Sequence, residues 1–358
     1  MVRKALGIPV VGSLNIDTVQ FHSQTLGHHH HHQATKPDKV VPGGIGANHA
    51  MAVHRMSHPI NQTATSQGRG ANSPFGVSVS IIGKVGGQDS HGKTLRKKLE
   101  SNHINIEAVK TVEDEITGTA TVQLYDDRRS AVHNVPNANS RLLPADVEDS
   151  LQAAGTDLVV VSLEILPETA SRAVALARKH KLPVILNLTP EPEPKVLDDT
   201  ELFKVDHLIM NHRDADKILA LSPIDETTRR KRSIVQTRYS EAASRFHERG
   251  ASCVVITLGE MGALASYVIP EHEEGAGGQK LWFFGAQVPV DPQGGRQKVE
   301  DETGASDAFV GAYAVEILRQ LHDERVASQS YDISSALDMG IKAGGFSVGV
   351  VGGMDGCP

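Results

Sequence analysis

The sequence predicts an α/β protein whose central, mostly parallel sheet carries helices on both faces. Apolar runs rich in β-branched residues recur along the 358-residue chain, at 9–12, 77–83, 157–163, 183–188, 207–211 and 253–257. Segments with helical spacing lie between some of these runs, and the clearest, 167–181, is expected to be a crossover helix. Near-continuous apolar strands that alternate with helices are typical of a parallel sheet covered on both faces.

Two segments depart from this alternation of apolar strands and helices. Residues at about 14–42 and 117–135 alternate between apolar and polar, as in TATVQLYDD, which indicates half-exposed antiparallel strands. We expect them to form a small, discontinuous β-sheet lid on a single domain that spans 1–358. Polar, turn-rich stretches are expected to be flexible surface insertions, at 57–75, 222–239 and 270–279.

Composition and charge limit the partners. The 43 acidic and 36 basic residues are interspersed and give a net charge of −7, so no basic field is available for a nucleic-acid backbone. No apolar run reaches the roughly 20 residues of a membrane-spanning helix, and the first apolar stretch is too short for a secretory signal. Cys253 and Cys357 are the only cysteines, which excludes a disulfide framework. We expect a small-molecule partner and a cytoplasmic protein, with the nucleus as the alternative compartment.

An internal run of five histidines, His28 to His32, is a candidate metal ligand because consecutive imidazoles can chelate an ion. No cysteine or acidic residue at a defined spacing completes a ligand set there. A solvated loop explains the run equally well.

The strongest chemical motif is DETGASDAF, in which a turn of small residues opens a helix. The unpaired N–H groups at such a helix start collect an anion, which suits a phosphoryl group in transfer. Asp307 at this helix start can take the proton of a sugar hydroxyl. The amides of the turn would then stabilise the charge on the phosphoryl group, and they belong to Gly304, Ala305, Ser306 and Asp307. A plainer interpretation, in which Asp307 only caps the helix, stays open.

Two further motifs offer groups that bind hydroxyls. PGGIGANHAMAVHRM, at 42–56, is a second glycine-rich turn that opens a helix, and Asn48 supplies an amide there. In GSLNID, at 12–17, Asn15 and Asp17 are two residues apart on a strand and therefore face the same side. Neither a dinucleotide-binding fingerprint nor a P-loop is present in the chain.

The motifs GSLNID, GGIGAN, TLGEMG and DETGASDAF, in this order, resemble the ribokinase branch of the PfkB carbohydrate kinases. The resemblance runs from about residue 8 to Pro358 and includes TGTATVQL at 117–124 and VVVSLEI at 159–165. It implies a ribokinase-like fold and ATP-dependent phosphorylation of D-ribose, or a related pentose, at the 5-hydroxyl. Asp307 would be the base, and 304–307 the anion hole.

The resemblance also implies roles for individual positions. The residues that would bind the sugar, together with Asp307, are Asn15, Asp17, Gly44, Asn48 and Glu164. Those on the nucleotide side would be Asn211, Thr257, Gly259 and Gly262, with Asp214 organising Mg²⁺ indirectly. A monovalent cation, usually K⁺, would lie beside the anion hole on Asp301, Thr303, Val350 and Gly352.

Two positions depart from the family pattern. Ile45 stands where the family's glycine turn usually has Lys, which leaves a nucleoside or another furanoside as an alternative acceptor. Ser306 stands where the catalytic turn usually has Gly, and a positive φ there would strain it by roughly 1–2 kcal/mol. A pseudokinase that binds sugar or nucleotide without catalysis is therefore a second alternative. The sequence leaves open whether the lid pairs two copies into a homodimer and whether a final helix is missing after Pro358.

Overall fold

The computed structural model describes most of the chain. The described residues are 5–22, 34–57, 76–125, 130–152, 154–222, 228, 231–269, 278–285, 299–322 and 331–358. The histidine run and all but Ser57 of the expected 57–75 insertion lie outside them.

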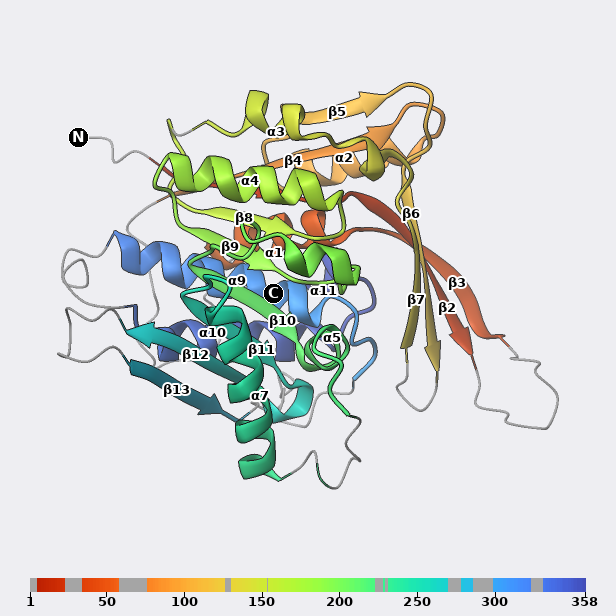
Figure 1. The fold of residues 1–358 in the computed structure, drawn as a ribbon. Coiled ribbons are helices and arrows are strands. Elements are labelled where there is room, and N and C mark those ends of the chain that lie inside the picture. Colours follow the sequence, from red (N-terminus) through yellow and green to blue (C-terminus); the bar gives the residue numbers. More distant parts are fainter. Residues whose placement is uncertain are drawn as a thin grey trace.

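A large sheet forms the centre of the protein (Figure 1). Within the described residues its strand order is β13-β12-β11-β10-β9-β8-β1-β4-β5. The strands from β5 to β11 in this order are parallel to one another, whereas at the other edge β12 pairs antiparallel with β11 and β13 pairs antiparallel with β12. Their bounds are β1 Leu6–Val11, β4 Val77–Gly86, β5 Val109–Val112, β8 Val159–Ser162, β9 Val184–Asn187, β10 His207–Asn211, β11 Cys253–Thr257, β12 Ala263–Ile269 and β13 Gly278–Phe284. The six apolar runs of the sequence all become strands of this sheet, which confirms the predicted fold class.

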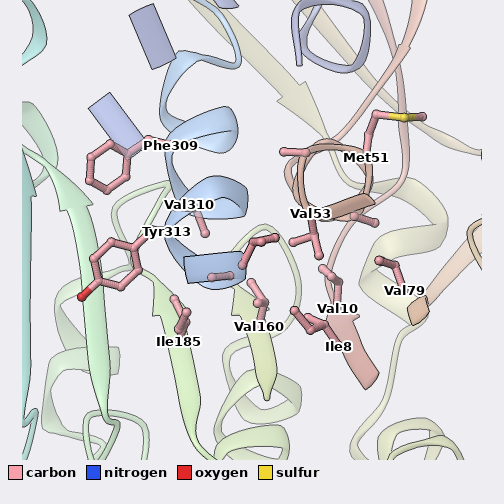
Figure 2. Close-up of a cluster of buried hydrophobic side chains, with 14 of the residues drawn as sticks. Ile8, Val10, Met51, Val53, Val79, Val160, Ile185, Phe309, Val310 and Tyr313 are labelled. Atoms are coloured by element: carbon pink, nitrogen blue, oxygen red, sulfur yellow. The ribbon is translucent and has the colours of Figure 1, made fainter. Parts of the chain in front are cut away.

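Helices cover both faces because alternate residues of each strand enter different cores. Val160 and Ile185 belong to a core with α1 (Ile45–Ser57), α2 (His91–Ser101), α9 (Ala305–Leu321) and α10 (Ile333–Ser347). Their strand neighbours Val161 and Leu186 belong to a second core with α3 (Pro144–Ser150), α4 (Pro167–Lys179), α5 (His212–Ile218) and α7 (Arg232–His247). Figure 2 shows the first core, in which Val310 of α9 and Val53 of α1 lie over the sheet.

Four short helices complete the described elements. Three are 3-10 helices at Asn137–Arg141, Pro194–Asp198 and Gly259–Met261, and the fourth is α11 at Gly353–Gly356. Among the described helices, none combines the length and the apolar composition that crossing a membrane requires.

A second, four-stranded sheet extends from the main body (Figure 1). Its strands are β2 (Asn15–His22), β3 (Ala34–Gly43), β6 (Gly118–Tyr125) and β7 (Ser130–Val135), in the order β3-β2-β6-β7. The outer pairs are antiparallel, as predicted, but the central pair of β2 and β6 is parallel. The reason is topological: β2 follows β1 and β6 follows β5. Because β1 and β5 are parallel, both chains leave the large sheet at the carboxyl ends of its strands and run in the same direction.

The prediction of a surface insertion at 222–239 is wrong in its second half, where α7 begins at Arg232. Val235 and Tyr239 are fully buried and lie one helical turn apart, with Phe246 buried two turns further on. This apolar stripe packs the helix on the sheet, while most of the surrounding residues are polar and hide the signal in the sequence. In the 270–279 stretch, only residues 278 and 279 are described, and they begin β13.

Candidate active site

The predicted anion hole is a tight turn at the start of α9. Gly304 is the N-cap of this helix and has φ +83°, a left-handed conformation that favours glycine. A Cβ at Gly304 would lie 2.6 Å from the Cα of Gly353, so the turn packs directly on the start of α11. Both constraints require glycine at this position, and together they fix the direction of the first amides of α9.

Ser306 does not carry the backbone strain that the sequence suggested for it. The described non-glycine residues with positive φ do not include Ser306, because it already lies in the first turn of α9. The positive φ of the turn falls on Gly304 instead. The Ser306 hydroxyl oxygen is buried and has no hydrogen-bond partner within the described structure. Its Cβ is thus tolerated, and its hydroxyl remains available to a ligand.

Asp307 is buried at this helix start and is held by α1. Its Oδ2 accepts a hydrogen bond of 2.7 Å from Nδ2 of Asn48, a residue 259 positions away in sequence. The two helices approach closely at small residues, since a Cβ on Gly311 of α9 would lie 2.3 Å from the Cβ of Ala52. A Cβ on Gly353 would lie 2.3 Å from Asn48 Nδ2, so α11 packs against the same amide. The sequence predicted each of the two polar residues but not this contact.

Glu164 organises the predicted sugar side. Its Oε2 accepts hydrogen bonds from Asn15 Nδ2 at 3.2 Å, from the Ile45 backbone N–H at 3.0 Å and from the Ser13 hydroxyl. Its Oε1 accepts one of 2.6 Å from Asn134 Nδ2 of β7. Burial raises the pKa of this carboxyl, and these donors offset part of that rise. Glu164 therefore ties the ends of β1, β8 and α1 to the smaller sheet.

Asp17 is a buried carboxylate with an oxygen that no described residue satisfies. Its Oδ1 has no partner, and a Cβ on Gly43 would lie 2.0 Å from its Oδ2, so only glycine fits beside it. Burial raises its pKa to about 8, and the negative charges of Glu164, Asp307 and Asp301 add to the rise. An unsatisfied buried acceptor at this position can bind a ligand hydroxyl.

This pKa predicts how stability depends on pH. The pKa of Asp17 rises from 3.8 to about 8 on folding, so between these values the folded protein holds a proton that the unfolded chain releases. Its contribution to the unfolding free energy is therefore present below pH 3.8 and is lost as the pH rises towards 8. Asp17→Asn is expected to raise the Tm of the ligand-free protein by several degrees at about pH 9 and by less at about pH 5. Calorimetry at both pH values checks this, and an equal gain at both would contradict it.

The predicted nucleotide side lies at the ends of β9, β10 and β11. Asn211 caps α5, where its Oδ1 accepts from the Asp214 backbone N–H at 2.9 Å and its Nδ2 donates to Asp214 Oδ2 at 2.7 Å. The Thr189 hydroxyl also donates to this Oδ2, at 2.8 Å. Burial raises the pKa of Asp214 to about 6, and the neighbouring Glu191 carboxylate adds to the rise. Mg²⁺ in phosphate sites usually takes one or two carboxylates along with phosphates and waters. Asp214 fits this donor set, and the neighbouring Glu191 also accepts from Lys217 Nζ at 2.6 Å.

The TLGEMG segment turns sharply after β11. Gly259 and Gly262 have φ of +61° and +91°, and the Leu258 N–H donates to the Gly262 carbonyl at 2.7 Å. The Thr257 carbonyl lies 3.3 Å from His212 Nδ1, which joins this turn to the start of α5. The two segments predicted to bind the nucleotide are therefore neighbours.

The two segments predicted to hold a monovalent cation also meet. Asp301 is buried, and its two carboxylate oxygens accept from the backbone N–H groups of Thr303, at 2.8 Å, and Gly352, at 3.0 Å. The N–H of Asp301 donates to the Val348 carbonyl, two residues before Val350. This carboxylate joins the two segments, and carboxylate and backbone carbonyl oxygens are the ligands that hard cations take.

Several polar residues in contact with the site were missed at the sequence level, and four of them show what the sequence can and cannot indicate. Ser13 and His49 lie inside the motifs, whereas Asn134 and Asn187 come from β7 and β9. For Asn187 a signal exists, because it is a polar residue at the carboxyl end of an apolar strand, the edge where α/β proteins bind ligands. For Asn134 the sequence offers no comparable signal.

Residues 5–358 match the model of the pfkB family carbohydrate kinases. The chain belongs to this family, in its ribokinase-like branch, and is a sugar kinase. The ribokinase of Haemophilus influenzae is 30% identical over 240 residues, which cover 63% of this chain and 74% of that protein. The deoxyribokinase of Salmonella typhi is 25% identical over 344 residues, which cover 96% and 92% of the two chains. The ribokinase of Arabidopsis thaliana, solved in complex with ribose and ATP, has the same fold, with a TM-score of 0.70 at 21% identity over 99% of this chain and 96% of that one.

Proposed function

We propose that this kinase transfers the γ-phosphoryl group of ATP to the 5-hydroxyl of D-ribose or a related pentose. The observation that carries the proposal is the Asp307 carboxylate, which is buried at the first turn of α9 and held by Asn48 at 2.7 Å. A candidate base, Asp307, and the anion-binding N-terminus of α9 thus lie within one helical turn of each other. Phosphoryl transfer needs both, because the acceptor oxygen loses a proton while negative charge is spread over the phosphoryl oxygens.

In the proposed reaction, Asp307 accepts the proton of the sugar hydroxyl as that oxygen bonds to the γ-phosphorus. The bond from this phosphorus to the bridging oxygen breaks, and ADP leaves. The N–H groups at the start of α9 donate to the phosphoryl oxygens in the transition state, in the direction fixed by the packing of Gly304 on Gly353. The unpartnered Ser306 hydroxyl is one further donor at this position.

A pentose is the acceptor that the sugar side supports best. Asp17 Oδ1 and Asn48 Oδ1 are buried acceptors without partners in the described structure, and sugar hydroxyls are the donors that suit them. The relatives named above act, by their names, on ribose or deoxyribose. Asn15 and Asp17 lie at the start of β2, a strand of the smaller sheet. We propose that this sheet covers the bound sugar as a lid.

The nucleotide side is proposed to hold ATP with Mg²⁺, organised by Asp214 and Asn211, over the Gly259 and Gly262 turn. Bound Mg²⁺ would neutralise phosphate charge. K⁺ is proposed to bind at Asp301 and at backbone carbonyls that include those of Thr303, Val350 and Gly352. Asp301 itself, through its hydrogen bonds to the N–H groups of Thr303 and Gly352, would hold these two loops beside the start of α9, which receives the phosphoryl group.

A panel of acceptors tests the proposal. With ATP, Mg²⁺ and K⁺ present, kcat/KM is measured for D-ribose, 2-deoxyribose, fructose, adenosine and inosine, and the site of phosphorylation is found by ³¹P NMR. We expect a pentose to be the preferred acceptor and the phosphate to be on its 5-hydroxyl. A nucleoside preferred to both pentoses would instead assign Ile45 to contact with a base. No turnover with any acceptor, in a protein that binds ATP, would reject the proposal.

A further inference from the structure

A fully buried histidine lies against the Asp307 carboxylate. His49 follows Asn48 on α1, and its Nε2 is 3.5 Å from Asp307 Oδ1. The same Nε2 is 3.1 Å from the side-chain nitrogen assigned to Asn187, at the end of β9. The other ring nitrogen, Nδ1, is buried and has no hydrogen-bond partner among the described residues. No motif in the sequence indicated a role for this histidine.

The surroundings of the ring favour one tautomer. A proton on Nδ1 would leave a buried N–H group without a partner and turn the Nε2 lone pair towards the carboxylate oxygen of Asp307, two unfavourable arrangements. A proton on Nε2 gives a donor to that carboxylate and leaves an unpaired acceptor at Nδ1. It also requires the Asn187 amide to turn, so that the amide nitrogen takes the buried position at which the Asn187 oxygen has no described partner. In this tautomer Asn187 presents its oxygen to the ring, an amide orientation that is equivalent in shape to the opposite one.

We propose that His49 is a positioning residue for Asp307, with its Nε2–H group shared between Asp307 Oδ1 and the Asn187 oxygen while Asn48 donates to Asp307 Oδ2. Two consecutive residues of α1 would then hold both oxygens of one carboxylate and fix its rotation. A base must keep its free lone pair within hydrogen-bond reach of the hydroxyl that it deprotonates, so this rotation bears on the rate. Asn187 orients the imidazole, as a third group orients the base in other catalytic sets. The inference rests on the proposed role of Asp307 as the base.

A purely structural role for His49 makes a different prediction. The ring is enclosed by α1, α9 and the sheet, so a leucine would fill much of its volume but provide no donor. If His49 only fills space, His49→Leu should behave like other apolar replacements in this core and leave kcat unchanged. If it orients Asp307, the loss should fall on kcat and should be reversed by a side chain that keeps a donor.

The kinetic test compares His49→Leu, His49→Gln and a matched control, His54→Leu, which lies on the same helix, is also buried and packs near the ring of His103. Loss of an orienting partner typically costs about 10- to 100-fold, and we expect this loss in kcat for His49→Leu with the KM for the sugar nearly unchanged. His49→Gln should recover most of kcat, and His54→Leu should retain it. An unchanged kcat in His49→Leu, an equal loss in His54→Leu or a loss confined to KM would each overturn the inference.

An NMR measurement tests the contact without relying on activity. In protein labelled with ¹⁵N-histidine, the His49 ring is expected to be the Nε2–H tautomer, and Asp307→Ala is expected to shift its Nε2 resonance. An Nδ1–H tautomer, or an Nε2 resonance that does not shift in Asp307→Ala, would contradict the proposed hydrogen bond. If the unmodified protein phosphorylates no acceptor, the proposed function fails, while these resonances still decide whether His49 donates to Asp307.

Discussion

Asp307→Asn is expected to lower kcat by about 10²- to 10⁴-fold and to leave the affinity for the sugar within several-fold. An asparagine keeps the shape of the side chain, and its oxygen can still accept the hydrogen bond from Asn48 that is 2.7 Å long in the native protein. It cannot take a proton from the acceptor hydroxyl. Steady-state kinetics with the preferred sugar, and a separate titration of sugar binding, measure the two quantities.

Asp332→Asn is the matched control for this variant. Asp332 is also an acidic residue at a helix start, where it caps α10 by accepting from the Ser335 N–H at 3.1 Å. Asparagine caps helices about as well as aspartate, so kcat should stay at the native level. If Asp307→Asn keeps more than about a tenth of kcat, Asp307 is not the base, and its role is reduced to that of a helix cap.

Gly304→Ala is expected to lower kcat by about 100-fold, because an error of about 1 Å in positioning catalytic groups can cost this much. The new Cβ would lie 2.6 Å from the Cα of Gly353, and backbone cannot give way as the end of a side chain can. The turn must therefore shift, and with it the amides that receive the phosphoryl group. The contact of Gly353 with Asn48 carries the displacement to the other side of Asp307.

Gly155→Ala separates this displacement from backbone strain. Gly155 has φ +86°, close to the +83° of Gly304, but a Cβ there would meet no atom within 4 Å. Both variants should lose about 1–2 kcal/mol of stability from the left-handed conformation, visible as a lower Tm. Only Gly304→Ala should lose kcat. Equal kcat values for the two variants would mean that the turn does not have to be rigid for catalysis.

Much of the fold could be predicted because its determinants are local. Most strands of the parallel sheet are buried on both faces and therefore appear as continuous apolar runs, as at 207–211 and 253–257. The parallel pairing of β2 with β6 was not predictable in this way, since alternation reports exposure and not strand direction. The helix at Arg232–His247 was hidden for a related reason: its buried residues are few and lie among charged ones.

The site was predictable residue by residue but not as a set of contacts. Glycine turns identified Gly304 and Gly44, because a positive φ restricts the residue type at each position. The contact of Asn48 with Asp307 depends on how α1 packs against α9, and no local pattern encodes it. His49 illustrates the same limit, since a histidine in a buried helix has no signature until its neighbours are known.

Sugar phosphorylation by this protein is observed most directly by ³¹P NMR of the unmodified protein incubated with ATP, Mg²⁺, K⁺ and D-ribose or 2-deoxyribose. We expect ADP to form only when the sugar is present, in equal amount to one phosphomonoester whose coupling places the phosphate on C5. The same incubation with Asp307→Asn should give only a trace of both products. ADP formation at the same rate without the sugar, or a phosphate on any other carbon, would contradict transfer to the 5-hydroxyl of a pentose.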